Sequence, residues 1–139
     1  MTAAANVYEG SCFCKKVRYR LEGPPKDMMN CHCTDCRKSH GSAFATLVEF
    51  PFKSLSYRQG KENLTTFTAP SGTKRSFCRT CGSIVSVWSD ADTAWLEISA
   101  STLDTPVDMR PTHHIYVRSR APWYEIRDDR PQHKASKDA

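Results

Sequence analysis

The seven cysteines of this 139-residue chain are the residues best suited to do chemistry, and they fall into three clusters. The first cluster is Cys12 and Cys14, the second is Cys31, Cys33 and Cys36, and the third is Cys78 and Cys81. Four protein ligands close a structural zinc site, whereas three ligands leave the open position that catalytic zinc keeps for water or substrate. The division of seven into four and three therefore predicts one zinc that holds the fold and another that carries a reaction.

The two outer pairs predict the structural site. Cys78 and Cys81 enclose a two-residue turn followed by Gly82, which is the form of a zinc knuckle, and glycine tolerates the backbone angle that such a turn needs. The first cluster is the available second pair, and Phe13 must lie in a bend if both of its sulfurs are to reach one metal. The pairs are about sixty residues apart, so a metal that joins them restrains the unfolded chain.

The central trio places three sulfurs within six residues, which predicts a second metal site. Its fourth ligand decides its chemistry: water or a substrate thiol gives a catalytic site, whereas His32 or His40 gives a closed structural one. We favour the open position, because His32 lies between two ligands and His40 follows a short turn. Three thiolates give much of their charge to zinc, which suits a thiol substrate attacking an aldehyde better than it suits water activation.

Composition limits the function classes. An odd number of cysteines argues against a disulfide framework and for metal-bound thiolates in a reducing compartment, so we expect a cytoplasmic protein. The formal charge is +5, and zinc sites of four and three thiolates would contribute about −2 and −1, leaving about +2. That charge disfavours nucleic-acid binding. No apolar run is long enough to span a membrane, and residues 1–9 do not resemble a secretory leader.

The rest of the sequence predicts a mainly β domain with one or two short helical turns. Runs rich in Val, Ile, Thr and aromatic residues alternate with Gly, Pro, Asn and Ser. The predicted strands are 17–21, 43–50, 55–57, 64–68, 84–88, 95–98 and 115–117. Thr34 is predicted to cap a short helical turn that runs through Asp35 to Ser39 and ends at Gly41, with another turn around 103–107. Residues 1–130 are predicted to form one zinc domain and residues 131–139 a polar, disordered tail.

Six segments, three of which contain the cysteines, carry a family resemblance that runs from Tyr8 to Arg130. They are residues 10–14, 31–44, 71–72, 77–82, 111–117 and 122–123. Together they resemble the glutathione-dependent formaldehyde-activating enzyme family. The resemblance implies a Mss4-like antiparallel β fold, structural zinc on the outer pairs (Cys12, Cys14, Cys78, Cys81) and a second, labile zinc on the trio (Cys31, Cys33, Cys36). It also implies a carbon–sulfur lyase-type reaction, run in reverse, in which glutathione adds to formaldehyde and gives S-hydroxymethylglutathione.

Three further residues are candidates for substrate handling. Arg37 and Lys38 follow the trio and could hold the carboxylates of glutathione. His114 lies in a motif of the family and could act as a general acid, because imidazole titrates near neutral pH. The expected partners are a small thiol and a small aldehyde, and the sequence indicates no oligomeric state. The alternative hypothesis is a non-catalytic zinc module that binds a partner protein or carries glutathione.

Overall fold

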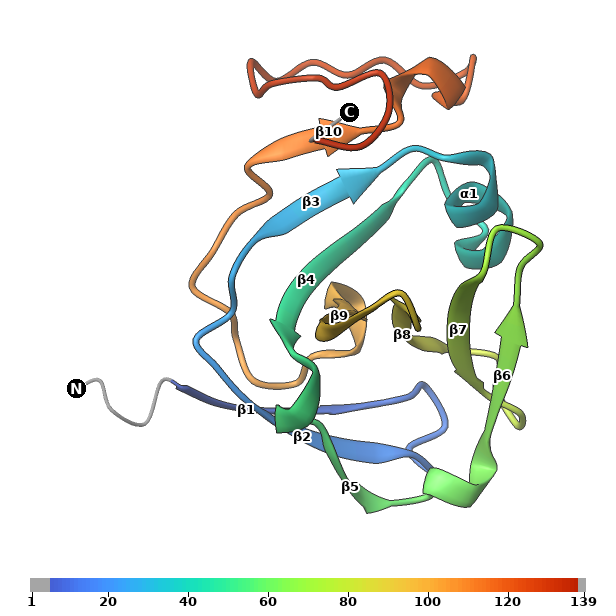
Figure 1. Cartoon of the computed structure of the whole chain (residues 1–139), viewed down its shortest axis with the longest axis vertical. Coiled ribbons are helices and arrows are strands. Elements are labelled where there is room, and N and C mark those ends of the chain that lie inside the picture. The colour runs from blue at the N-terminus through green and yellow to red at the C-terminus, as the bar shows by residue number, and fades with distance from the viewer. Residues whose placement is uncertain (1–5, 138–139) are drawn as a thin grey trace. The chain divides into compact units, whose positions relative to one another are not determined.

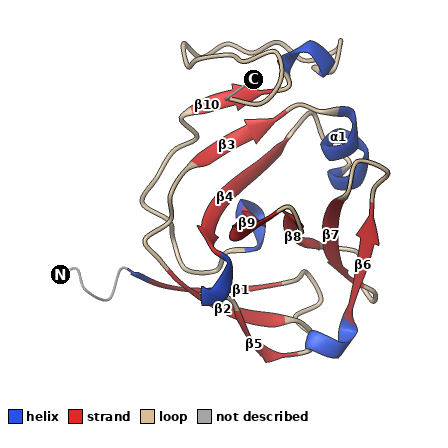
Figure 2. Cartoon of the chain, viewed as in Figure 1, coloured by secondary structure: helices blue, strands red, loops and turns tan. Residues whose placement is uncertain are grey.

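The computed structural model describes residues 6–137, in which strands and short helical turns alternate (Figure 2). Contacts divide the chain into two units, each made from two segments of sequence. Among the described residues, unit 1 takes 6–26 and 48–108, and unit 2 takes 27–47 and 109–137. The prediction of a mainly β fold is confirmed, and its cysteine clusters are consistent with a Mss4-like fold. A single domain over residues 1–130 stays a prediction, and residues 1–5 lie outside the described part.

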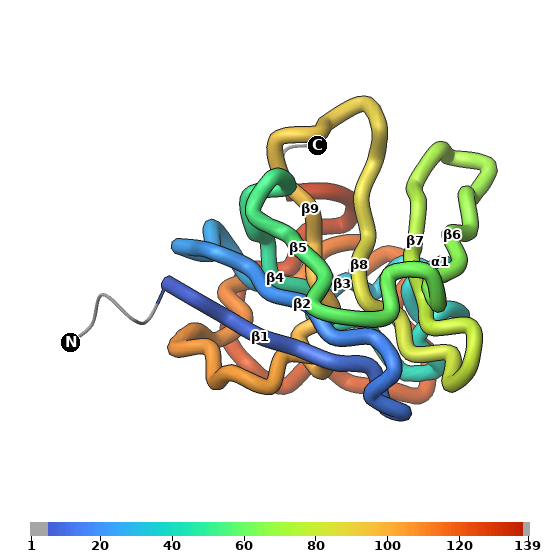
Figure 3. The backbone as a smooth tube through the Cα atoms, turned by 90° about the horizontal axis from the view of Figure 1, so that it is seen from below, coloured from blue at the N-terminus to red at the C-terminus, as the bar shows by residue number. Residues whose placement is uncertain are grey.

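Unit 1 begins with a three-stranded antiparallel sheet, in the order β1 (Val7–Ser11), β2 (Arg18–Glu22) and β5 (Ser56–Gln59) (Figure 3). The alternation of basic and apolar residues along β2 buries Tyr19 and Leu21 completely and leaves Arg18 exposed. Gly10 of β1 pairs with Tyr19, and a Cβ at Gly10 would lie 2.2 Å from atoms of that ring. Glycine is therefore required here by the close approach of the tyrosine.

A longer antiparallel run completes unit 1 (Figure 1). It contains β6 (Leu64–Thr68), β7 (Thr73–Cys78), β8 (Ile84–Ser89) and β9 (Asp92–Ser99), each paired with the next. The last four residues of β4 (Ala45–Pro51) belong to this unit and follow β9 in the strand order. Val85, Leu96 and Ile98 from β8 and β9 are buried. β7 ends at Cys78, so the sheet itself delivers one of the outer cysteine pairs.

Unit 2 is built on two parallel strands, β3 (Met28–Cys31) and β10 (His113–Ile115). Their register pairs His114 with Asn30 and Ile115 with Cys31. The first three residues of β4 lie beside β3, and Thr46 there donates a hydrogen bond from Oγ1 to Asn30 Oδ1 at 2.7 Å. All four residues of β3 are buried. This strand is followed by α1 (Thr34–His40), which contains Cys36 of the trio and has Cys33 as its N-cap.

The polar C-terminal segment is hydrogen bonded to β10. His114 N–H donates to the Pro131 carbonyl and His133 N–H to the His114 carbonyl, both at 2.9 Å, while Val117 N–H donates to the His133 carbonyl at 3.0 Å. Composition favoured disorder from Pro131 onward, but the structure gives these backbone groups partners as far as Ala135. Backbone pairing does not depend on side-chain polarity, which is why composition missed it.

Several predicted elements agree with the structure and others differ. The strand 64–68 is confirmed with its bounds, whereas no predicted strand covered β1, β3 or β7. β7 carries Lys74 and Arg75 in its middle, which hid it from a search for apolar runs. The second helical turn is η4 (Ala100–Thr102) rather than residues 103–107, and three more turns are η2 (Phe52–Ser54), η3 (Lys61–Asn63) and η5 (Val117–Ser119). No helix within residues 6–137 is long and apolar enough to cross a membrane.

Candidate metal centres

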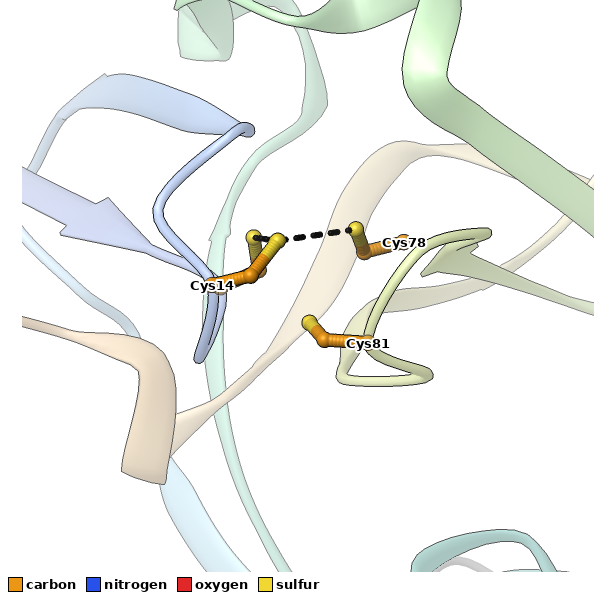
Figure 4. A group of neighbouring side chains, drawn as sticks. Cys14, Cys78 and Cys81 are labelled. Atoms are coloured by element: carbon orange, nitrogen blue, oxygen red, sulfur yellow. Dashed lines mark hydrogen bonds between the residues drawn. The ribbon is translucent and has the colours of Figure 1, made fainter.

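The outer cysteine pairs meet at one point in unit 1, as the sequence predicted. All four sulfurs, from Cys12, Cys14, Cys78 and Cys81, lie within 4.8 Å of one another. Cys14 Sγ is 3.6 Å from Cys12 Sγ and 3.7 Å from Cys78 Sγ, and Figure 4 shows the labelled side chains converging from two different loops. All seven cysteines are free thiols. The cluster is therefore a set of four convergent thiols and not a pair of disulfides.

Two tight turns bring these sulfurs together. β1 ends at Ser11, and the chain turns at Phe13 and Cys14, where Cys12 C=O accepts from Lys15 N–H at 3.1 Å. The second turn follows β7, where Gly82 N–H donates to Cys78 C=O at 2.7 Å. Gly82 has φ of 80°, in the left-handed region that side chains with a Cβ rarely adopt. The bend predicted at Phe13 and the glycine requirement of the knuckle are both confirmed.

Nearby hydrogen-bond donors point at the sulfurs. Asn63 Nδ2 lies 3.2 Å from Cys78 Sγ, and Val17 N–H lies 3.3 Å from Cys12 Sγ. Ser83 Oγ accepts from Phe13 N–H at 3.0 Å, so its hydroxyl hydrogen is available for Cys81 Sγ at 3.2 Å. Such donors to a ligand atom favour its ionised form and fix its direction.

The thiols of Cys81 and Cys14 differ in acidity. Burial opposes ionisation of Cys81, but hydrogen bonds from Ser83 and from backbone N–H groups lower the pKa of its thiol to about 5. The Lys16 backbone N–H lowers the pKa of Cys14, yet burial and the neighbouring thiols together raise it to about 11. The cluster thus retains protons that a bound cation would displace, because a thiol must ionise to become a metal ligand.

The spacing of the sulfurs fits a tetrahedral zinc ion. Zinc–sulfur distances of about 2.3 Å give a tetrahedron whose edges are about 3.8 Å. The two separations measured from Cys14 Sγ, 3.6 Å and 3.7 Å, are close to that edge. The four cysteines would therefore complete the coordination of such an ion and leave no position for a substrate.

The central trio forms a second cluster, in unit 2. The sulfurs of Cys31, Cys33 and Cys36 lie within 4.8 Å of one another. Cys31 is the last residue of β3, and Cys33 is the N-cap of α1, where its sulfur accepts from Cys36 N–H at 3.1 Å. The cap was predicted at Thr34, but Cys33 takes that role because its sulfur reaches the orphan amide. Gly41, with φ of 61°, ends the helix as predicted.

The trio gathers three ligand atoms and no fourth. Among residues 6–137, no His, Asp or Glu atom joins the trio's sulfurs within the same 4.8 Å limit. His32 and His40, the two residues that could have closed the site, are not members of the group. Hydrogen bonds among the thiols, followed by burial, raise the pKa of Cys31. Cys31 thus retains its proton until a cation displaces it, and the three sulfurs suit zinc with one position left over.

His32 and His114 form a buried hydrogen-bonded chain with Asp128. His32 Nε2 is 2.9 Å from His114 Nδ1, and His114 Nε2 is 3.0 Å from Asp128 Oδ2. Burial lowers the pKa of His32 to about 4, and the hydrogen bond from His114 lowers the pKa of the Asp128 carboxyl. His32 is therefore neutral and Asp128 ionised near neutral pH.

The other predicted site residues lie close to the trio in sequence. Arg37 is partly buried in the last turn of α1 and its Nε has no hydrogen-bond partner among the described residues, whereas Lys38 is exposed. Sequence reasoning missed Asp128, Asn63 and Ser83. Nothing in their local sequence marks them. Asp128 and Asn63 contact partners 14 and 15 positions away in the sequence, and Ser83 contacts Cys81, two positions before it.

A family model and several known proteins match this chain. The family model of the glutathione-dependent formaldehyde-activating enzyme matches residues 7–119. A Halomonas elongata protein with the provisional name of glutathione-dependent formaldehyde-activating enzyme is 31% identical over 134 residues, covering 86% of this chain and 81% of its own. A Schizosaccharomyces pombe protein named as an uncharacterized lyase is 31% identical over 75 residues, about half of each chain (54% and 53%). A Rhodobacter sphaeroides crystal structure has a TM-score of 0.61 and 25% identity, covering 72% of this chain and 91% of its own.

Proposed function

The chain belongs to the glutathione-dependent formaldehyde-activating enzyme family, and on that premise we propose that it is a zinc-dependent carbon–sulfur lyase-type enzyme. Its reaction would join a glutathione-like thiol to formaldehyde or a related small aldehyde. The proposed cofactors are two zinc ions per chain, with glutathione as substrate and the cytoplasm as the compartment. The observation that carries the proposal is the trio, which offers three convergent thiols and lacks a fourth ligand atom among the described residues.

The two clusters would divide the work. Cys12, Cys14, Cys78 and Cys81 would hold a zinc that stabilises unit 1, because their four sulfurs satisfy the ion completely. Cys31, Cys33 and Cys36 would hold the second zinc. When bound there, zinc would supply the positive charge that lowers the pKa of an incoming thiol toward neutrality.

The reaction needs little from the protein beyond binding and orientation. The thiol sulfur forms a bond to the aldehyde carbon, the carbonyl π bond breaks toward oxygen, and the proton lost by the thiol is balanced by one gained by that oxygen.

Arg37 and Lys38 would hold the carboxylates of glutathione. His114 already uses both ring nitrogens, with His32 and Asp128. Direct proton donation by His114 to a substrate would therefore break one of these hydrogen bonds.

Exchange spectroscopy with ¹³C-formaldehyde and glutathione tests the proposal, because it measures the rate of S-hydroxymethylglutathione formation at equilibrium. We expect the zinc-loaded protein to accelerate exchange above the uncatalysed rate. Cys33→Ser should abolish the acceleration and lose about one zinc per chain, as expected when one of three ligands is removed, while the far-UV circular dichroism is retained. An exchange rate equal to the uncatalysed one would instead favour the non-catalytic zinc module.

A further inference from the structure

Hydrogen bonds connect Asp128 to His114 and His114 to His32. His32 lies between Cys31 and Cys33 of the trio in the sequence. His32 and His114 are almost completely buried, with 0% and 2% of their surfaces exposed. The side chain of Asp128 is about one-third exposed and is held in place by Arg130 N–H, which donates to its Oδ1 at 3.0 Å. A carboxylate at the surface is thus connected through one buried ring to a second buried ring.

The hydrogen bonds of this chain have a direction. Asp128 can only accept, so His114 Nε2 must donate to it. With His114 uncharged, His114 Nδ1 is then an acceptor, and His32 Nε2 must donate to it. His32 therefore carries its hydrogen on Nε2 and leaves Nδ1 as a bare acceptor.

That remaining nitrogen has no partner in the described structure. His32 Nδ1 is buried and makes no hydrogen bond. The ring is confined by Phe44 and Tyr124, whose centroids lie 5.0 Å and 6.5 Å from its own, and its backbone N–H is fixed on Ile115 C=O at 2.9 Å. A buried acceptor left without a donor destabilises the protein, so a donor is expected to occupy this position in the functional state.

We infer that Asp128 and His114 are positioning residues that present His32 Nδ1 as a hydrogen-bond acceptor for an N–H group of the thiol ligand. This inference rests on the proposed function, because it places that ligand beside the trio. The amide and ammonium groups of a peptide thiol such as glutathione supply the donor. A thiol that lacks N–H groups cannot make this contact, so the site selects among thiols by their nitrogen groups.

The isosteric substitution Asp128→Asn should reverse the direction of the hydrogen bonds between residue 128, His114 and His32. Arg130 N–H would still donate to the side-chain oxygen of the new asparagine. The amide NH₂ of that asparagine would then lie beside His114 Nε2 and donate to it. His114 would then carry its hydrogen on Nδ1 and donate to His32 Nε2. His32 would in turn carry its hydrogen on Nδ1, and the acceptor would become a donor.

Two-dimensional ¹H–¹⁵N spectra of the imidazole rings, recorded at pH 8 on zinc-loaded protein, test this direction without an activity assay. We expect His32 protonated on Nε2 in the wild type and on Nδ1 in Asp128→Asn, with no change in Asp129→Asn, which removes the neighbouring exposed charge. A wild-type His32 protonated on Nδ1 would overturn the inference without any variant. A variant whose tautomer does not change would also overturn it.

Calorimetric titration with two thiols tests the ligand. Asp128→Asn should weaken glutathione binding about tenfold, which is what the loss of one hydrogen bond of about 1.4 kcal/mol gives. The affinity for 3-mercaptopropionate, which has no N–H group, should be unchanged. Equal losses for both thiols, or an equal effect of Asp129→Asn, would overturn the assigned contact. If the wild type binds neither thiol, both the proposed function and the ligand contact at His32 are wrong. The imidazole spectra still decide the direction of the hydrogen bonds between His32, His114 and Asp128.

Discussion

Removal of a cysteine should cost more stability at the outer pairs than at the trio, because the two sites close loops of different length. Cys14 and Cys78 are 64 residues apart, whereas Cys31 and Cys36 are 5 apart. The chain-entropy relation for a cross-link gives about 4 kcal/mol for the longer loop and about 2 kcal/mol for the shorter one. Cys78→Ser should therefore destabilise the zinc-loaded protein about twice as much as Cys33→Ser.

Urea unfolding followed by far-UV circular dichroism measures this difference, with zinc content determined on the same samples. A loss of about 4 kcal/mol is a large part of the 5–15 kcal/mol that stabilises an ordinary domain, so Cys78→Ser should be partly unfolded at 37 °C. Cys33→Ser should retain a cooperative transition. Equal losses of unfolding free energy, or a larger loss in Cys33→Ser, would refute the assignment of the outer pairs to stability and of the trio to chemistry.

Three further predictions concern the outer site. Ser83→Ala removes the hydroxyl donor to Cys81 and should weaken zinc binding about 10- to 100-fold in chelator competition, whereas Ser56→Ala on exposed β5 should not. Gly82→Ala forces a Cβ into φ of 80° and should lower the free energy of unfolding by about 1–2 kcal/mol; an unchanged urea midpoint would contradict the knuckle strain. In metal-free protein, the Cys81 pKa of about 5 lies below its ordinary value of 9.0. The ionised Cys81 thiol should therefore raise the free energy of unfolding fully above pH 9.0, and this contribution should be lost as the pH falls to about 5. In Cys81→Ser the free energy of unfolding should increase less between pH 5 and pH 9. An unchanged pH dependence would contradict the stabilisation by the Cys81 thiolate.

The cysteine clusters could be predicted from sequence because metal ligands come in short, recognisable spacings. The knuckle at Cys78 and Cys81 and the helix end at Gly41 follow from local geometry, and both are present in the structure. The strand of Leu64–Thr68 was also predicted with its observed bounds, because β-branched residues fill it.

The hydrogen-bonded surroundings of the sites could not be predicted in the same way. Asp128 reaches His114 across 14 residues, and His114 reaches His32 across 82. The contact between His114 and His32 depends on the parallel pairing of β3 with β10, which no local pattern encodes. Trp123 is a large aromatic residue, yet 70% of it is exposed. Apolar character alone does not locate a residue, because apolar side chains also occur at the surface.

An open position at the trio is what would let the protein bind a substrate thiol, and X-ray absorption at the zinc edge measures whether that position exists. With both sites loaded, four sulfurs at one zinc and three at the other give an average of 3.5 sulfurs per zinc. Saturation with glutathione should raise the average to 4, because one thiol sulfur completes the second site. An average that stays at 3.5, with a histidine nitrogen in the spectrum before and after the thiol is added, would show that the trio is closed and would contradict the account.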